Sequence, residues 1–171
     1  NEDYASVPAE MKKVASYFGK SVLREVTLDE ILANIPKLRE VAGDRAIMRA
    51  IHFENENERV TAQTEALKNG DIDGFFKGVI ESGNSSFKYL QNVYTVKNVA
   101  EQGLSLALCL AEIALKGKKA AYRVHGGGFA GTIQAFVKTE DVPAFRKALD
   151  SAFGEGATTE LKVRPYGAIR I

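Results

Sequence analysis

Cysteine and histidine are scarce in this sequence, and their scarcity argues against a disulfide-stabilised protein and against a zinc protein. The single cysteine, Cys109, cannot form an internal disulfide, which fits a reducing cytoplasm. The two histidines, His52 and His125, are far apart and do not have the spacing of zinc ligands, so we expect no metal site. His52 is one helical turn from Glu56, and a structural hydrogen bond is its expected role.

The chain also lacks an excess of charge and a long apolar run. Its 23 basic and 22 acidic side chains give a net charge of +1, with no basic run interleaved with aromatics, so we expect neither nucleic acid nor a membrane surface as a partner. The most apolar stretch, residues 104–115, contains Glu112 and is too short to span a bilayer, so it predicts a buried helix. A length of 171 residues suits a single domain over 1–171.

Hydrophobic periodicity predicts a helical first two-thirds and a β-rich last third. Helices are expected at 4–18, from Thr27 to just before Pro36, and at 44–68, 72–83, 100–116 and 141–153. Strands are expected at 120–124, 132–137 and 158–164, with a possible short strand at 168–171. The inward stripe of the longest helix would be Ala46, Ala50, Phe53, Val60 and Leu67. This order indicates an α+β fold with helices packed on one face of an antiparallel sheet.

Three consecutive glycines stand between two of these strands, in the run HGGGFAG at 125–131. Gly126, Gly128 and Gly131 match G-x-G-x-x-G, but a dinucleotide site needs a helix to begin at the last glycine, and a strand pattern follows instead. Two interpretations remain. The glycines could form a flat connection on which another domain packs, or their backbone N–H groups could line a nest near an anion.

The same run carries a resemblance to a known family. Residues 121–131, AYRVHGGGFAG, resemble the galactokinase motif R-M-T-G-G-G-F-G-G; galactokinases belong to the GHMP superfamily of small-molecule kinases. Residues 49–60 resemble the family's R-x-x-H-x-x-x-E-N-x-R-V helix, residues 2–4 its S-E-Y-N segment, and residues 21–26 its S-L-R-E-V. These matches run in family order over nearly the whole chain, and they correspond to the C-terminal half of a galactokinase.

The resemblance implies an ATP- and Mg-dependent enzyme that phosphorylates the anomeric hydroxyl of galactose. In the family, the galactose signature, the phosphate-binding loop and the catalytic Asp precede the segment that Tyr4 matches. We therefore expect a C-terminal piece of a cytoplasmic kinase, inactive alone, with no catalytic residue of its own. ATP and Mg would be bound mainly by the missing N-terminal domain, which is its expected partner.

The resemblance also implies two sets of site residues. Tyr4 would contact the sugar, for which a phenol offers an apolar face and a polar tip; otherwise it covers the first helix. The loop that would support the nucleotide site, by direct contact or by packing alone, comprises Gly126, Gly127, Gly128, Phe129 and Gly131. Without its partner domain this face is expected to self-associate at high concentration.

One segment departs from the family. Residues 82–91, SGNSSFKYLQ, stand where galactokinases have S-H-A-S-L-R-D-D-Y-E, so the His and both Asp residues are absent. This leaves open a GHMP kinase for a different, modified sugar. A third alternative is a non-catalytic ligand-binding module of the same fold.

Overall fold

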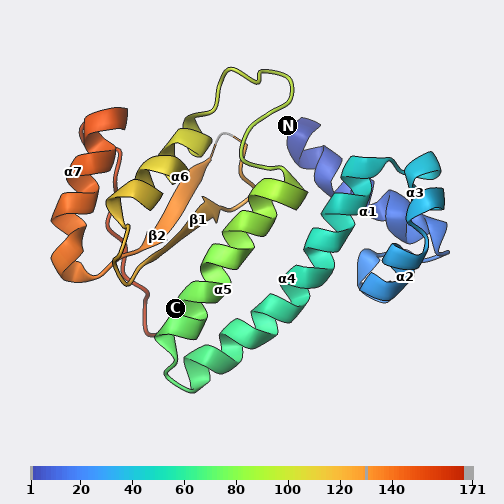
Figure 1. Cartoon of the computed structure of the whole chain (residues 1–171), viewed down its shortest axis with the longest axis horizontal. Coiled ribbons are helices and arrows are strands. Elements are labelled where there is room, and N and C mark those ends of the chain that lie inside the picture. The colour runs from blue at the N-terminus through green and yellow to red at the C-terminus, as the bar shows by residue number, and fades with distance from the viewer. Residues whose placement is uncertain (1, 130, 168–171) are drawn as a thin grey trace.

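A long helical hairpin separates two parts of the molecule in the computed structural model, which describes residues 2–129 and 131–167 (Figure 1). A cluster of short helices lies at one end, and a two-stranded sheet with two helices lies at the other. The helices are α1 (Glu2–Tyr17), α2 (Leu28–Ala33), α3 (Ile35–Val41), α4 (Asp44–Lys68), α5 (Ile72–Ser85), α6 (Gly103–Ala114) and α7 (Val142–Phe153). The strands are β1 (Ala121–His125) and β2 (Thr132–Phe136). Single turns lie at Leu23–Glu25, Ser86–Leu90 and Thr139–Asp141.

The first part is a core built where α1, α2 and α3 meet the first half of α4. Its buried side chains are Val14, Ala15, Leu23, Val26, Ile31, Leu38, Ala46, Ile47 and Ala50. The predicted capping box begins α2: the Thr27 side chain accepts a hydrogen bond from the Glu30 amide, and the Glu30 carboxylate accepts one from the Thr27 amide. This cap fixes the residue at which α2 begins.

The second half of α4 pairs with α5, and here one expectation is wrong. The buried residues of α4 end at His52, whereas Val60 is 59% and Leu67 is 50% exposed. The cluster of short helices does not reach this far along α4, and α5 covers a single side of it (Figure 1). A periodic apolar stripe is buried only where a neighbour lies against it, so this end of the predicted stripe faces outward.

The α+β class is confirmed by the second part. Strands β1 and β2 are antiparallel, with Ala121 opposite Phe136 and His125 opposite Thr132. One face of the sheet packs on α6 and α7, in a core built from Ala111, Leu115, Phe145 and Leu149, with Tyr122, Ile133, Ala135 and Val137 against it. Because side chains alternate along a strand, the other face presents Arg123 and Phe136 to α5. Helices therefore lie on both faces of this sheet, and not on one face as the sequence predicted, because α5 of the helical hairpin covers the second face.

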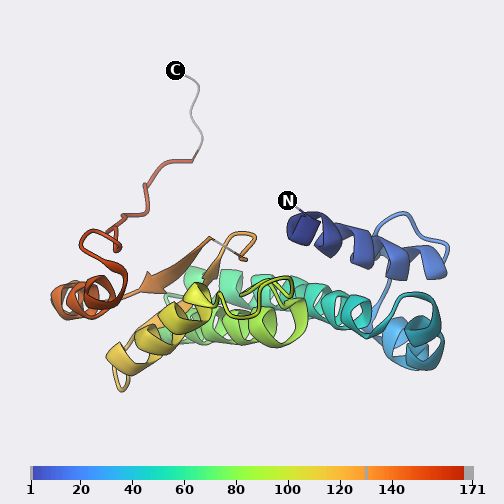
Figure 2. The same ribbon diagram turned by 90° about the horizontal axis from the view of Figure 1, so that it is seen from above.

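Two segments differ from the sequence prediction, and a third lies where no comparison can be made. The strand expected at 158–164 is absent: these residues have no regular structure and lead away from the body of the molecule (Figure 2). The strand expected at 168–171 lies outside the described residues. The polar segment at Ser85–Ser86 is helical, since α5 runs to Ser85 and a π turn follows. None of the described helices is both long and apolar enough to cross a membrane.

Candidate functional site

The glycine loop joins β1 to β2, and its backbone takes conformations that favour glycine. Gly126 has φ +61° and Gly128 has φ +78°, both in the left-handed region. Phe129 is left-handed as well, with φ 60°, although it carries a side chain. Gly131 closes the turn by donating its N–H to the Gly128 carbonyl at 3.2 Å. The loop therefore depends on glycine at 126 and 128, and it holds one strained non-glycine residue, Phe129, directly after the second of them.

Tyr4 lies directly on this loop, although 124 positions separate Tyr4 from Gly128 in the sequence. Its hydroxyl donates to the Gly128 carbonyl at 3.1 Å, and its ring meets the Phe129 ring edge-on, with centroids 5.5 Å apart. A Cβ on Gly127 would lie 2.0 Å from the Tyr4 Cε1 atom. Tyr4 remains 50% exposed. The structure thus places Tyr4 against the predicted glycine loop, through Gly127, Gly128 and Phe129.

Asn92 supports the other side of the loop, and no sequence motif pointed to this residue. Its side chain is 1% exposed. Its backbone carbonyl accepts the Phe129 amide at 2.5 Å, and its Nδ2 donates to the Gly127 carbonyl at 3.3 Å. A Cβ on Gly128 would lie 1.9 Å from the Asn92 carbonyl oxygen. The loop is clamped between Tyr4 and Asn92, and glycine permits this close approach at 127 and 128.

The clamped loop leaves part of its backbone available. Gly126 and Gly127 are exposed, and within the described residues their N–H groups donate to no acceptor. Successive free N–H groups attract an anion or a partner's carbonyl. This surface therefore suits either interpretation of the loop, an anion nest or a platform for another domain. The self-association expected of this face stays a prediction.

A second group of polar side chains holds β1 against the helical hairpin. Ser82 on α5 donates to the Glu56 carboxylate at 2.6 Å, and Arg123 on β1 donates to Ser82 and lies 3.8 Å from the same carboxylate. His52 Nδ1 lies 2.9 Å from Ser85 Oγ, so the structural hydrogen bond expected for this histidine is confirmed. Burial, with the charges of Arg59 and Arg123 adding to it, lowers the pKa of His52 to about 4, and the imidazole is therefore neutral at pH 7.

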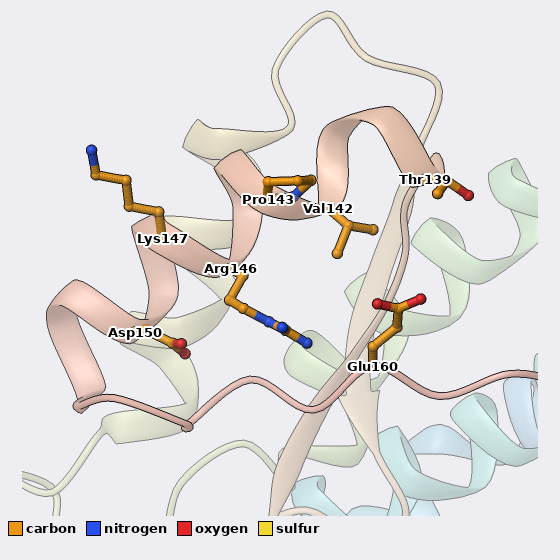
Figure 3. Close-up of a pocket in the computed structure, with 7 residues that line it drawn as sticks. All are labelled: Thr139, Val142, Pro143, Arg146, Lys147, Asp150 and Glu160. Atoms are coloured by element: carbon orange, nitrogen blue, oxygen red, sulfur yellow. The ribbon is translucent and has the colours of Figure 1, made fainter.

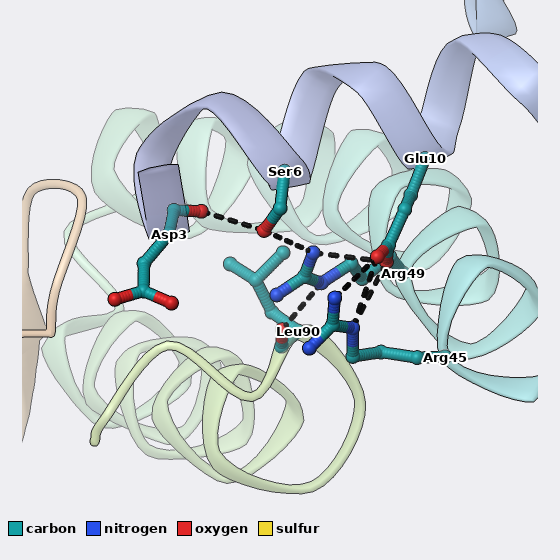
Figure 4. A network of polar contacts seen from close by, with 6 residues as sticks. All are labelled: Asp3, Ser6, Glu10, Arg45, Arg49 and Leu90. Carbon is teal, nitrogen blue, oxygen red and sulfur yellow. Dashed lines mark hydrogen bonds and ion pairs between the residues drawn. The ribbon is translucent and has the colours of Figure 1, made fainter. Parts of the chain in front are cut away.

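Arg49 makes a third group of contacts, on the side of α4 that faces α1 and Leu90 (Figure 4). Its Nε donates to the Leu90 carbonyl at 3.0 Å, and its Nη1 donates to Ser6 Oγ and to Glu10 Oε2, both at 2.9 Å. Burial raises the pKa of Glu10, but the hydrogen bond from Arg45 and the charge of Arg49 outweigh it, so the net shift is downward. The sequence placed Arg49 in a motif without indicating these contacts.

A shallow groove lies apart from these residues, beside α7 (Figure 3). Its volume is about 520 Å³, and it is lined by Thr139, Val142, Pro143, Arg146, Lys147, Asp150 and Glu160. Arg146 reaches from α7 toward the segment that carries Glu160. None of the site residues predicted from the sequence lines this groove. Across residues 2–129 and 131–167, no three His, Cys, Asp or Glu side chains gather in a way that could hold a metal ion.

The comparisons with known proteins agree on one class. No protein-family model matches the chain. The chain is 31% identical over 147 residues to a galactokinase of Glaesserella parasuis, and 28% identical over 166 residues to one of Haemophilus influenzae. These alignments cover 86% and 96% of this chain but only 36% and 40% of those proteins. The crystal structure of Lactococcus lactis galactokinase complexed with galactose matches with a TM-score of 0.69 and 26% identity, over 91% of this chain and 38% of that one.

The α+β fold is thus similar to that of part of a sugar kinase, the galactokinase of Lactococcus lactis. More particularly, the chain is a homologue of galactokinases along nearly its whole length, and it spans less than half the length of the relatives it matches. The resemblance drawn from the motifs is confirmed, and the match is consistent with the C-terminal part of such a kinase.

Proposed function

We propose that residues 1–171 are the C-terminal domain of a cytoplasmic galactokinase, which transfers the γ-phosphoryl group of MgATP to galactose and yields galactose 1-phosphate and ADP. The observation that carries this proposal is the contact of Tyr4 with the glycine loop, because it joins the two elements that the resemblance assigns to the sugar and the nucleotide sides. The chain would form one wall of the cleft between them.

The residues of this chain fit a supporting role toward ATP. The N–H groups of Gly126 and Gly127, which donate to no acceptor within residues 2–129 and 131–167, suit a phosphate oxygen or the backbone of a neighbouring phosphate-binding loop. The nucleotide supplies the transferable phosphoryl group when bound, and Mg²⁺ would be held mainly by the partner domain. Placement of the loop by Tyr4 and Asn92 would be this chain's contribution to a reaction that depends on positioning and charge stabilisation.

The altered segment at 82–91 is engaged inside the protein. Ser82 bonds to Glu56, Ser85 lies beside His52, and Ser86 is buried. Ser82 and Ser85 stand where the family motif also has Ser, so these contacts keep a family feature that holds α4, α5 and β1 together. Of the altered positions, Gly83 lies against β1, where an added Cβ would be 2.9 Å from the Arg123 Cβ. Lys88 and Tyr89, which replace the two Asp residues, are exposed.

The direct test is release of ADP in the presence of MgATP by the upstream-extended protein, with the 171-residue chain assayed beside it. Galactose, glucose and an N-acetylated hexosamine are the sugars to compare. We expect turnover on galactose by the extended protein alone. Turnover on a different sugar only would move the proposal to a sibling kinase, and silence on all sugars would favour a non-catalytic binding module. Activity of the 171-residue chain itself would contradict its role as a supporting domain.

A sharper prediction concerns the direction of the hydrogen bond between Tyr4 and the sugar. A phenol has one hydrogen, and that of Tyr4 is donated to Gly128, so its oxygen is left to accept from a sugar hydroxyl. Replacing that hydroxyl with fluorine, which accepts but does not donate, is expected to lower kcat/KM by about 3- to 10-fold. Steady-state rates over a set of monofluorinated galactoses check this.

Tyr4→Phe is the matched control for the fluorinated sugars. It keeps the ring contact with Phe129 and removes the phenol oxygen. We expect the fluorine penalty at one ring position to disappear in Tyr4→Phe. An equal penalty at every position in both proteins would show that Tyr4 accepts no hydrogen bond from the sugar.

A further inference from the structure

The buried guanidinium of Arg49 lies between the two segments that clamp the glycine loop. Arg49 is 1% exposed, and its donors are divided between α1 and the end of the π turn at Ser86–Leu90 (Figure 4). A guanidinium is planar and presents its donors in a fixed fork, so bonds made to two segments also fix those segments relative to each other. The two sets of contacts can be followed separately to the loop.

The first set runs through Leu90 to Asn92. Arg49 Nε donates to the Leu90 carbonyl, and the chain then makes a left-handed step at Gln91, with φ 56°. Asn92 follows immediately and holds Gly127 and Phe129 through its side chain and its backbone carbonyl. Because Gln91 is the single residue between Leu90 and Asn92, a fixed position of the Leu90 carbonyl also restricts the position of the Asn92 carbonyl.

The second set runs through Ser6 and Glu10 to Tyr4. Ser6 Oγ accepts from Arg49 and donates to the Asp3 carbonyl at 2.7 Å, so its hydroxyl joins Arg49 to the first turn of α1. Glu10 lies one turn further on and accepts from the same Nη1 atom. Tyr4 belongs to that first turn, and the helix transmits the position set by Arg49 to it.

Arg45 shows that charge alone does not explain this arrangement. It also lies on α4 and makes a bidentate pair with Glu10. Its side chain is 37% exposed, however, and it bonds to neither Ser6 nor Leu90. The two arginines thus share one partner, and Arg49 alone reaches both supports of the loop.

We propose that Arg49 is a positioning residue that couples Tyr4 to Asn92, so that the glycine loop is held from both sides as one unit. The contacts of Arg49 with Leu90, Ser6 and Glu10 do not depend on any substrate. Its consequence for catalysis rests on the proposed function, in which Tyr4 serves the sugar side and the loop serves the nucleotide side. A shift of Arg49 would then disturb both sides together.

The test is hydrogen exchange, resolved by peptide, on the 171-residue chain without ligand. Arg49→Lys keeps a positive charge for Glu10, but an ammonium group cannot span Leu90 and Ser6 as the guanidinium does. We expect amide exchange at Phe129 and Gly131 to quicken about 10-fold or more, while the paired amides of β1 and β2 keep their protection. Arg45→Lys, the matched control, is expected to leave the exchange of the loop unchanged.

Two results would overturn the proposal. One is loop exchange that rises equally in Arg49→Lys and Arg45→Lys, and the other is exchange that rises uniformly over α1, α4 and the sheet. Should Arg49→Lys fail to fold, Ser6→Ala removes the hydroxyl that joins Arg49 to the first turn of α1 and leaves the bonds to Leu90 and Glu10 in place. About 3-fold faster loop exchange is then expected, and no change would count against the coupling.

Activity separates this inference from the proposed function. If Arg49 does not position the loop, the unaltered extended kinase still turns over galactose. If the chain serves no galactokinase, the exchange difference between the Arg49 and Arg45 variants persists in the absence of turnover. In an active kinase we expect Arg49→Lys to lower kcat by more than it raises the KM for galactose, because the loop is displaced from the reacting phosphate.

Discussion

Gly128→Ala is expected to destabilise the protein by about 2–4 kcal/mol, or to displace the glycine loop at a similar local cost. Two effects combine at this position. A side chain at φ +78° is strained, and the added Cβ would lie 1.9 Å from a backbone carbonyl oxygen, that of Asn92, which cannot rotate away. To relieve this clash the loop must separate from Asn92. The separation breaks the hydrogen bond from the Phe129 amide to the Asn92 carbonyl and the one from the Tyr4 hydroxyl to the Gly128 carbonyl. Urea unfolding, together with exchange of the Phe129 amide, measures the loss.

Gly126→Ala is the control that separates strain from contact. Gly126 has φ +61°, but a Cβ there would meet nothing within 4 Å. We expect a cost of about 1 kcal/mol from backbone conformation alone. Equal losses at 126 and 128 would show that Asn92 does not press on the loop. Gly127→Ala adds a third comparison, because its Cβ would strike the Tyr4 ring, which can move, and not a backbone atom.

Stability is expected to fall by about 3 kcal/mol through His52 alone as the pH drops from 6.5 toward 4. The pKa of His52 is lowered to about 4 in the folded protein from a usual value of 6.5. Between these values the unfolded chain binds a proton that the folded chain refuses, so unfolding is favoured as the pH falls. The stabilisation is complete above pH 6.5. Free energies of unfolding in urea at pH 4.5 and pH 7 give the difference.

The comparison that isolates His52 uses glutamine. His52→Gln keeps a polar group near Ser85 and cannot titrate, so we expect a smaller loss of stability between pH 7 and pH 4.5 than in the unaltered protein. His125→Gln removes the only other histidine of the sequence, which is exposed at the end of β1. This variant should lose as much stability between pH 7 and pH 4.5 as the unaltered protein does. An identical pH dependence in all three proteins would mean that carboxylates such as Glu10 account for it.

Local signals in the sequence predicted most of the elements. Thr27 and Glu30 have the spacing of a capping box, and the structure forms both of its hydrogen bonds. The stripe of Val142, Phe145, Leu149 and Phe153 predicted α7 as an amphipathic helix. Phe145 and Leu149 are buried, whereas Phe153, at the end of the helix, is 40% exposed. These features depend on residues within a turn or two of one another, so no knowledge of the rest of the fold was needed.

What the sequence could not supply were contacts that depend on distant neighbours. A strand was predicted at 158–164, but a strand also needs a partner, and the side chains of Leu161 and Val163 lie almost fully exposed. Asn92 falls in no motif, and it became visible as a support of the loop only when β1 and β2 were placed beside it. Tyr4 and the glycines were chosen from family resemblance, whereas their mutual contact could come only from the structure.

The bond between Tyr4 and Gly128 joins residues 124 positions apart, and this separation has a consequence for how the protein is made. At a synthesis rate of about 5–20 residues per second, Tyr4 leaves the ribosome roughly 6–25 s before Gly128. The helical cluster of α1–α4 can form in that interval from contacts that are close in sequence, but the clamp cannot. A nascent chain would thus carry a folded helical end with an unfinished site, and Tyr4 would stay uncovered until the last third of the protein emerged.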